Sequence, residues 1–407
     1  MRIIHTSDWH IGRTLFGKKR YDEFEAFLGW LSKLISDKKV DALLVAGDVF
    51  DTTTPGHKSQ ELYYRFLCQI ASACRHVVVI GGNHDSPSFL NAPREILRAI
   101  NVHVIGSAEN NPDDEILFLK NSENVEELAV CAVPYLRDCD IRISEAGESF
   151  DDKNRKLLEG IRQHYSDVCK SAMQKLNTLK SKIPFVIMGH LFATGGKTID
   201  GDGVRELYVG TLAHLSASIF PDSADYVALG HLHIPQMVND SPKIRYSGSP
   251  LPMGFGEAGQ QKKICQIDFV DGTTQVELIN IPIFQKIESI KGSLEKILLR
   301  INALSASGEK TWLEIIYEGD EIIGNLRERL EEAISGKEIE ILRIKNNRII
   351  DRILNQNSDV ETLDDLSRED IFDRCLAAHK IPDEQRPELK NSYHEILHAI
   401  DSTDNNT

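Results

Sequence analysis

The chain of 407 residues has no apolar run long enough to cross a membrane. A membrane-spanning helix needs about 20 consecutive apolar residues, whereas runs such as Leu43–Ala46 and Val77–Ile80 have only the length of strands. Asp8 follows the start of the chain too closely for the apolar core of a signal peptide to precede it. We therefore expect a cytoplasmic protein.

Paired cysteines are also missing. The chain has 7 cysteines, an odd number, and no two of them form a Cys-x-x-Cys pair. This pattern excludes a zinc ribbon and a disulfide framework, and it is typical of reduced thiols in the cytoplasm.

Two enzyme signatures fail as well. The segment that ends in Lys197-Thr198 resembles a phosphate-binding loop for ATP, but Leu191 occupies the position of its first glycine. The Gly-x-Ser-x-Gly elbow of serine hydrolases is absent. The sequence therefore predicts neither ATP binding by this chain nor a serine nucleophile.

Basic residues are outnumbered by acidic ones. The chain carries 47 Lys and Arg against 62 Asp and Glu, which gives a formal net charge of −15. A simple basic clamp for nucleic acid needs clustered Lys and Arg to neutralise phosphates, so that class is disfavoured. If the protein handles phosphates, something other than its net charge must neutralise them.

The pattern of apolar residues predicts an α/β region over the first 280 residues. Amphipathic helices are expected around Phe24–Ile35 and Leu62–Ile70. Short apolar strands alternate with helices, and this order favours a buried sheet covered by helices. Residues 136–182 are polar and are expected to form a helical insertion. The predicted strands lie at residues 3–4, 41–46, 77–80, 128–133, 185–188, 226–229 and 263–269.

The pattern changes after about Pro282. Strands near 285–290, 311–317 and 338–344 alternate with helices around 294–304 and 326–334, which predicts a small separate α+β domain. Residues 355–370 form a polar, acidic linker. Beyond it, one helical face carries Leu389, Tyr393, Ile396, Leu397 and Ile400. That face either packs on the chain itself or docks on a partner.

Polar residues of the kinds that bind metals gather where the predicted strands end. In open α/β sheets the carboxyl ends of the strands are where sites are built. Each short motif alone is explained by turn chemistry, but five of them after five strands indicate one site. They contain Asp8 and His10, Asp48 and Asp51, Asn83, His84 and Asp85, His190, and finally His231 and His233.

These side chains offer oxygen and imidazole ligands without a thiolate. Such a set favours manganese, iron, zinc or magnesium over soft metals. One carboxylate, Asp48, can bridge two cations about 3.5–4 Å apart, which is the spacing of two-metal phosphoesterases. A histidine beside the cations can act as a general acid.

At these motifs the chain resembles the calcineurin-like metallophosphoesterases. The strings His5–His10, Val45–Asp51 and Val227–His233 are similar to those of the nuclease subunits of bacterial SbcCD complexes, and Tyr246–Glu257 resembles their usual continuation. The resemblance implies a β-sandwich flanked by helices, a small α+β capping domain and C-terminal helices. It places the nuclease domain at 1–280, the capping domain at 281–350, and the linker with partner-docking helices at 351–407.

The resemblance also implies a role for each matching residue. Asp8, His10, Asp48 and His233 would hold one metal ion, and Asp48, Asn83, His190 and His231 would hold the other. His84 would be the catalytic histidine that assists the leaving oxygen, and Asp51 would orient it. Manganese is the implied cofactor, with magnesium as the alternative.

The implied activity is cleavage of DNA phosphodiesters. It comprises 3′→5′ exonuclease action on double strands and endonuclease action on single strands and hairpins, driven by an SbcC-type, SMC-like ATPase. The protein would act in DNA repair, recombination and replication, as a homodimer within a heterotetramer associated with the nucleoid.

Two other interpretations stay open. The chain could be a metallophosphoesterase for nucleotides or phosphoproteins, although Thr52 and Asp85 stand where protein phosphatases of this fold carry Arg and Glu. It could also be a non-catalytic scaffold, although its ligand set is intact. The basic cluster of Arg13 and Lys18–Arg20 is either a solvated loop or a contact for phosphates.

Overall fold

The computed structural model describes residues 1–141, 149–193, 215–319, 323, 325–346, 376 and 386. The chain divides into two compact units. The first comprises Met1–Ser289 with Ser307–Glu314 and Gly336–Leu342, and the second comprises Ile290–Ala306, Ile315–Ser335 and Arg343–Thr407. The predicted bounds at 280 and 350 stay a prediction, and the C-terminal stripe and the 355–370 linker lie outside the described residues.

The first unit contains two six-stranded sheets. In the first sheet β1 pairs in parallel with β4, β4 with β5 and β5 with β6, whereas β13 and β14 are antiparallel. Its strand order is β14 (Thr273–Asn280), β13 (Lys263–Val270), β1 (Arg2–Thr6), β4 (Ala42–Ala46), β5 (His76–Ile80) and β6 (Val102–Ile105).

The second sheet has the same mixed character. Strands β8, β9, β10 and β12 run parallel to their neighbours, and β7 and β11 are antiparallel at the two edges. Its order is β11 (Gln236–Met237), β12 (Ile244–Tyr246), β10 (Tyr226–Gly230), β9 (Phe185–His190), β8 (Glu126–Ala132) and β7 (Ile116–Lys120).

The two sheets pack face to face over a shared core. Strand β4 shows why: Leu44 faces the core between the sheets, while Leu43 and Val45 face the outer core under the helices. Side chains alternate between faces along a strand, so a strand that is apolar throughout is buried on both sides. The β-sandwich flanked by helices that the sequence predicted is confirmed.

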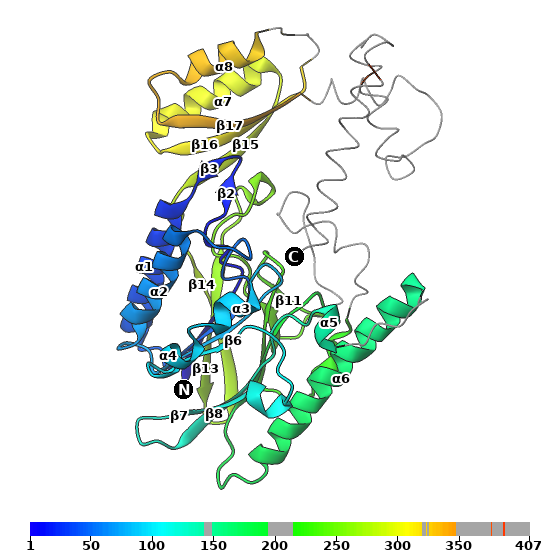
Figure 1. Cartoon of the computed structure of the whole chain (residues 1–407). Coiled ribbons are helices and arrows are strands. Elements are labelled where there is room, and N and C mark those ends of the chain that lie inside the picture. Colours follow the sequence, from blue (N-terminus) through cyan, green and yellow to red (C-terminus); the bar gives the residue numbers. More distant parts are fainter. Residues whose placement is uncertain are drawn as a thin grey trace. The chain divides into compact units, whose positions relative to one another are not determined.

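Helices cover the outer face of each sheet (Figure 1). On the first sheet lie α1 (Tyr21–Lys38), α2 (His57–Ile70), α3 (Pro87–Asn91) and α4 (Arg94–Arg98), with a β2–β3 hairpin (Thr14–Leu15, Lys18–Lys19) before α1. The second sheet is covered by α6 (Phe150–Leu176), preceded by α5 (Asp138–Ile141). These two helices confirm that residues 136–182 are largely helical. Short 3₁₀ turns lie at η1 (Pro112–Glu115), η3 (Ala217–Ile219) and η4 (Phe255–Glu257).

A three-stranded sheet follows, in the order β15-β16-β17. The elements predicted after Pro282 are all found: β15 (Lys286–Gly292), α7 (Leu294–Ser307), β16 (Thr311–Tyr317), α8 (Leu326–Ile334) and β17 (Ile339–Asn346). Helix α7 buries Leu294, Ile297, Ile301 and Leu304 on one face, which is the periodic stripe seen in the sequence.

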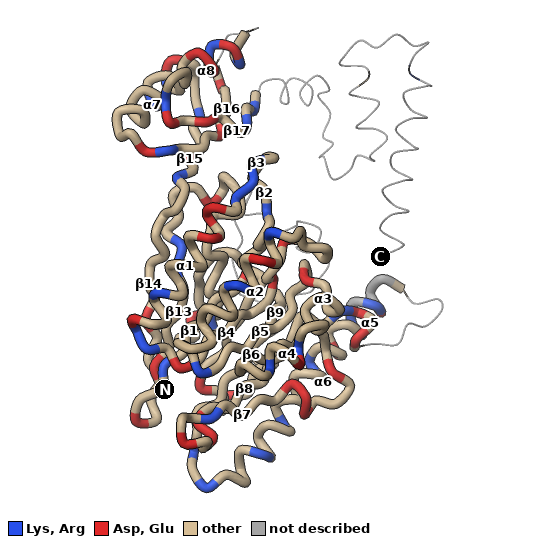
Figure 2. The backbone as a smooth tube through the Cα atoms, turned by 60° about the vertical axis from the view of Figure 1, so that its left-hand side comes forward, with Lys and Arg blue, Asp and Glu red and all other residues tan. Residues whose placement is uncertain are grey.

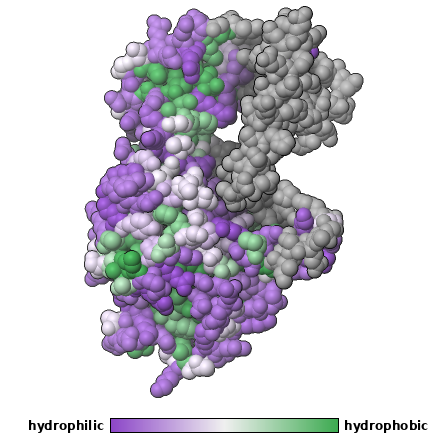
Figure 3. Space-filling model, in the orientation of Figure 1, coloured by the Kyte–Doolittle hydropathy of each residue, from purple (hydrophilic) through white to green (hydrophobic). Residues whose placement is uncertain are grey.

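The visible surface of the first unit is mostly hydrophilic, with scattered hydrophobic residues between the hydrophilic ones (Figure 3). Along the described backbone, acidic and basic residues are interspersed (Figure 2). Among the described helices, none is long and apolar enough to cross a membrane, and the six described cysteines are free thiols.

Candidate metal centre

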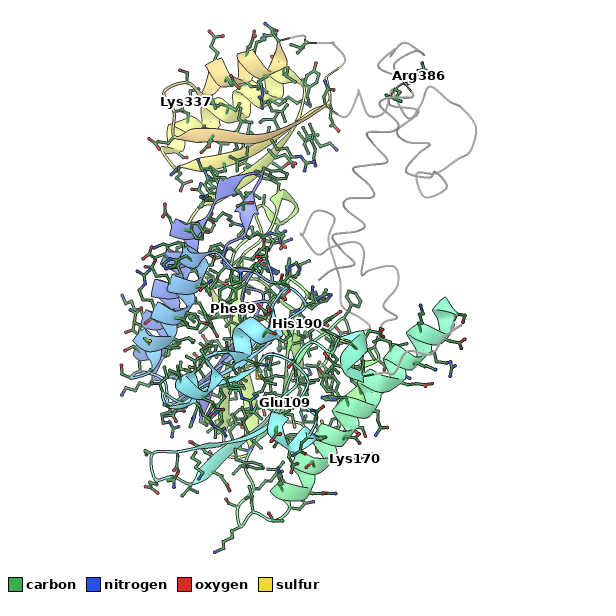
Figure 4. The ribbon with its side chains drawn as sticks, viewed as in Figure 1. Phe89, Glu109, Lys170, His190, Lys337 and Arg386 are labelled. Atoms are coloured by element: carbon green, nitrogen blue, oxygen red, sulfur yellow. The ribbon has the colours of Figure 1, made fainter. Side chains whose placement is uncertain are left out.

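The predicted site residues come together at the carboxyl ends of strands from both sheets. Asp8 and His10 follow β1, and Asp48 and Asp51 follow β4. Asn83 and His84 follow β5, whereas His190 ends β9 and His231 and His233 follow β10. In Figure 4 the labelled His190 lies in the middle of the first unit. The site is therefore assembled by the packing of the two sheets.

The first group surrounds His10. Its Nε2 lies 3.2 Å from Nε2 of His233 and 3.6 Å from Oδ2 of Asp48. Ligand atoms of Asp8, His10 and His233 all lie within 4.8 Å of one another. The three side chains are buried, and the amide of His231 donates to Oδ1 of Asp8 at 2.9 Å. The structure thus gathers the four residues predicted for the first metal ion.

The second group surrounds Asn83. Its Oδ1 lies 3.0 Å from Nε2 of His190 and 3.0 Å from Nδ1 of His231. Nε2 of His190 lies 3.4 Å from Oδ2 of Asp48. The other ring nitrogen of His190, Nδ1, lies 2.9 Å from the carbonyl oxygen of Ala46 and can only donate to it. This contact fixes Nε2 as the nitrogen that faces the site, and Asp48 contacts both groups.

The contacts of Asp51 differ from the predicted ones. Its carboxylate Oδ1 lies 3.3 Å from Nδ1 of His10 and 3.1 Å from Nη1 of Arg13. His84 contacts Asp51 through the main chain instead, with Nδ1 at 3.0 Å from the carbonyl oxygen. The backbone of this loop turns at Asp48, which has a φ of 51°. Asp51 therefore contacts His84 through its carbonyl and His10 through its carboxylate.

The backbone around the ligands is in an unusual conformation. Asp8, His10, Asp48 and His231 have φ of 53°, 47°, 51° and 101°, a region that residues with a side chain rarely adopt. Amides and carbonyls of the two loops pair to hold it: Asp8 donates to Gly47 at 3.0 Å and His10 to Asp48 at 3.0 Å. Such outliers concentrate at functional sites, where the surrounding structure holds them.

A glycine preserves the space for Asp48. A Cβ on Gly82 would lie 2.1 Å from Oδ1 of Asp48 and 2.3 Å from its amide nitrogen. We expect Gly82→Ala to displace the Asp48 carboxylate, to lower the free energy of unfolding by about 1–3 kcal/mol through overpacking, and to weaken binding of Mn²⁺. Thermal unfolding and Mn²⁺ titration measure these effects.

Gly29→Ala is the matched control, because nothing lies within 4 Å of a Cβ at that helical position. Alanine there is expected to stabilise the chain by about 0.5–1 kcal/mol. Equal Mn²⁺ affinity in Gly82→Ala and the wild type would contradict the packing argument.

The buried groups of the site have shifted pKa values. Burial raises the pKa of Asp8 to about 7. Burial also opposes ionisation of Asp48, but attraction to His190 outweighs it and holds the pKa of Asp48 well below its ordinary value. Burial disfavours the charged form of His190 as well, yet its attraction to Asp48 raises its pKa to about 9. The pKa of His231 falls to about 3, chiefly because of burial.

This arrangement fits divalent cations. Because Nδ1 of His190 donates to Ala46, its Nε2 is the nitrogen that lies between Asp48 and Asn83. A cation can bind there, because Nε2 of His190, when it carries no proton, is an electron-pair donor like Oδ2 of Asp48 and Oδ1 of Asn83 beside it. In the first group, two Nε2 atoms face each other at 3.2 Å beside two buried carboxylates. The donor set therefore fits divalent metal ions, and their binding would release protons.

The roles of several supporting residues were not predicted from the sequence. Ser7 donates to Oδ2 of Asp8 and lies 2.8 Å from the hydroxyl of Ser247. The buried Asp85 carboxylate accepts from the amides of Val49, Phe50 and Gly82 at 2.9–3.1 Å. Its role is therefore to hold two site loops together. Ser247 lies in the Tyr246–Glu257 segment, so the segment was visible in the sequence but the roles within it were not.

The early basic cluster is largely paired within the chain. Arg20 is buried and binds Glu23 through two contacts of 2.8 Å, and it donates to the Pro252 carbonyl at 2.6 Å. Lys18 pairs with Glu340 at 2.7 Å. The prediction of a solvated or phosphate-binding loop is therefore wrong for Arg20, because its charge is used to anchor α1. The Lys197-Thr198 segment lies outside the described residues.

Comparisons with known proteins give the same answer as the motifs. Residues 1–235 match the calcineurin-like phosphoesterase family, and residues 283–380 match the family described as type 5 capsule protein repressor C-terminal domain. The SbcD subunit of nuclease SbcCD from Escherichia coli (strain K12) is 34% identical over 407 residues, covering 98% of both chains. The proteins of the same name in Bacillus subtilis (strain 168) and Rhodobacter capsulatus are 35% and 34% identical, each covering 67% of both chains.

A match over more than half of the chain and a relative that covers nearly all of it establish the family. The metallophosphoesterase domain implies divalent metal ions, in agreement with the Asp and His groups of the site. The chain therefore belongs to the calcineurin-like phosphoesterases, within the family formed by the SbcD subunits of SbcCD nucleases.

Proposed function

We propose that the chain is the nuclease subunit of an ATPase-driven complex and that it hydrolyses DNA phosphodiester bonds with two divalent metal ions. One observation carries this proposal: the full-length similarity to the SbcD subunit of nuclease SbcCD coincides with a complete set of Asp, Asn and His side chains at one edge of the sandwich. A scaffold without activity would have no need of that set.

The two groups of side chains define two metal positions. Asp8, His10, Asp48 and His233 would hold one ion, and Asp48, Asn83, His190 and His231 would hold the other, with Mn²⁺ as the preferred metal. When bound, the ions neutralise phosphate oxygens and lower the pKa of a water molecule. This charge compensation is local, so it operates in a chain of net charge −15.

His84 is positioned to act as a general acid. Its Nδ1 donates to the Asp51 carbonyl at 3.0 Å, so its Nε2 is directed away from that loop. Its amide donates to Oδ1 of Asp48 at 2.9 Å, which ties its backbone to the shared carboxylate. The side chain is only half-buried, unlike the other histidines of the site. We assign it the role of protonating the leaving oxygen of the DNA strand.

The partners follow from the same relatives. Because those relatives are named as one of the subunits of nuclease SbcCD, an SbcC-type ATPase is the proposed partner, with two copies of each protein in the complex. Residues 281–350 would form the capping domain and residues 351–407 would dock on the ATPase. The proposed activities are 3′→5′ degradation of duplex ends and opening of hairpins during DNA repair and recombination, in the cytoplasm at the nucleoid.

A nuclease assay tests this function. With Mn²⁺, the isolated chain is expected to cut labelled hairpin DNA, and addition of the SbcC-type ATPase and ATP is expected to stimulate degradation of a blunt duplex. This acidic chain is expected to bind DNA weakly when alone, and because each phosphate contact that it makes displaces a counterion, its binding should weaken further between about 50 and 200 mM salt.

A phosphopeptide and a mononucleotide phosphodiester serve as competing substrates in the same assay. Turnover of either of them without cleavage of DNA would contradict the nuclease assignment. Equal duplex degradation with and without the ATPase would contradict the proposed complex.

A further inference from the structure

The imidazoles of His10 and His233 have a similar arrangement of neighbours: the other ring lies at Nε2 and a carboxylate lies at Nδ1. Nε2 of His10 and Nε2 of His233 face each other at 3.2 Å. On the opposite side of each ring, Nδ1 faces a carboxylate: Oδ1 of Asp51 lies 3.3 Å from His10, and Oε1 of Glu257 lies 3.7 Å from His233. Histidines that bind metals commonly have a carboxylate at the outer nitrogen, which orients the ring and makes the inner nitrogen a better donor.

Each of these carboxylates also has a cation. Nη1 of Arg13 lies 3.1 Å from Asp51, and both side chains are partly exposed. Nζ of Lys262 lies 2.6 Å from Oε2 of Glu257, and here the side chains are only 3% and 0% exposed. The order cation, carboxylate, imidazole therefore occurs twice, once at the rim of the site and once in the interior.

The buried pair holds His233 from two directions. Glu257 faces its ring, while Nζ of Lys262 donates to its carbonyl oxygen at 3.1 Å and to the hydroxyl of Ser249 at 3.1 Å. The second carboxylate oxygen of Glu257 accepts from the amide of Met253 at 2.8 Å. Ring and main chain of His233 are thus tied to one ion pair, which is itself tied to the segment between Ser249 and η4.

Stability alone gives little reason for this pair. Removing two charges from water is costly, and replacement of a buried ion pair by well-packed hydrophobic residues of similar volume is often neutral or stabilising. The described part of the chain has a second buried ion pair, Arg20 with Glu23, whose side-chain hydrogen bonds go to each other and to the Pro252 carbonyl. The two pairs therefore allow a purely structural role to be separated from a role at the site.

We propose that Glu257 and Lys262 are positioning residues for His233, and that they set the affinity of the first metal position. This inference rests on the proposed metal-dependent function. Glu257 keeps the Nε2 lone pair of His233 directed at the metal position, and Lys262 holds the Glu257 carboxylate in place. The Asp51–Arg13 pair does the same for His10 from the exposed side.

Mn²⁺ titration calorimetry on the full chain tests the proposal. Glu257→Gln is expected to weaken binding at one of the two positions by about 10–100-fold and to leave the other unchanged. Glu23→Gln, in the second buried pair, is expected to lower the melting temperature and to leave both Mn²⁺ affinities as in the wild type.

The double variant Glu257→Gln with Lys262→Met covers the case in which Glu257→Gln fails to fold, because it leaves no lone buried charge. It is expected to fold and still to bind one Mn²⁺ about 10–100-fold more weakly. Wild-type affinity at both positions in a folded Glu257 variant would overturn the inference. Failure of the wild type itself to bind Mn²⁺ would instead refute the proposed function.

Discussion

Asp48→Ala is expected to lower DNA cleavage by about 10³-fold or more and to weaken Mn²⁺ binding at both positions. Asp48 is the carboxylate that contacts both groups, with Oδ2 at 3.6 Å from His10 and 3.4 Å from His190. Metal ions contribute several kcal/mol of stabilisation to developing charge, and each 1.36 kcal/mol corresponds to a factor of ten in rate. Single-turnover cleavage of labelled DNA and Mn²⁺ calorimetry measure the two effects.

Asp37→Ala is the control for this variant. It removes one acidic side chain from the exposed face of α1, which changes the net charge equally and leaves the site intact. Cleavage and Mn²⁺ binding at wild-type levels in Asp48→Ala would refute the two-metal arrangement.

His84→Gln is expected to separate catalysis from metal binding. Loss of a general acid lowers rates by about 10²–10⁴-fold. His84 contacts the Asp48 carboxylate only through its amide, and glutamine keeps that amide. DNA cleavage should therefore fall steeply while both Mn²⁺ affinities are retained.

A phosphodiester with a p-nitrophenol leaving group makes the test of His84 sharper. That leaving group departs without a proton, so the rate with this substrate should fall much less than the rate with DNA. His57→Gln, at the exposed start of α2, is the matched control. An equal loss with both substrates would assign His84 a role other than protonation of the leaving oxygen.

Much of the fold could be predicted because its strands are apolar on both faces. Strands β4, β5, β9 and β10 are buried throughout or nearly so, and their ends coincide with the polar motifs. The missed strands lack this signal. Strand β14 is an edge strand whose residues are mostly exposed or half-exposed, and β6 has only four residues. Short or exposed strands have no periodicity that separates them from loops.

The sequence predicted which side chains gather at the strand ends, but not the contacts that they make there. Strand ends from one sheet are expected to meet, but the pattern of strands alone does not show that His190 and His231 from the second sheet reach Asn83 of the first, which only the family resemblance implied. The direction of a side chain depends on local backbone angles, which explains why Asp51 faces His10 rather than His84. Glu257 and Lys262 lie in the long segment between β12 and β13, whose path the pattern of apolar residues does not predict.

The origin of the ligands in two different sheets has a consequence for the life of the protein in the cell. Metal ions held by ligands from both sheets would bind only the folded chain, so free metal would stabilise it in proportion to the logarithm of its concentration over the dissociation constant. At 100 times that constant, one such site contributes about 2.7 kcal/mol. A lower concentration of free divalent metal would then increase the fraction of unfolded chain. Because proteases cleave the unfolded chain, the protein would be degraded faster.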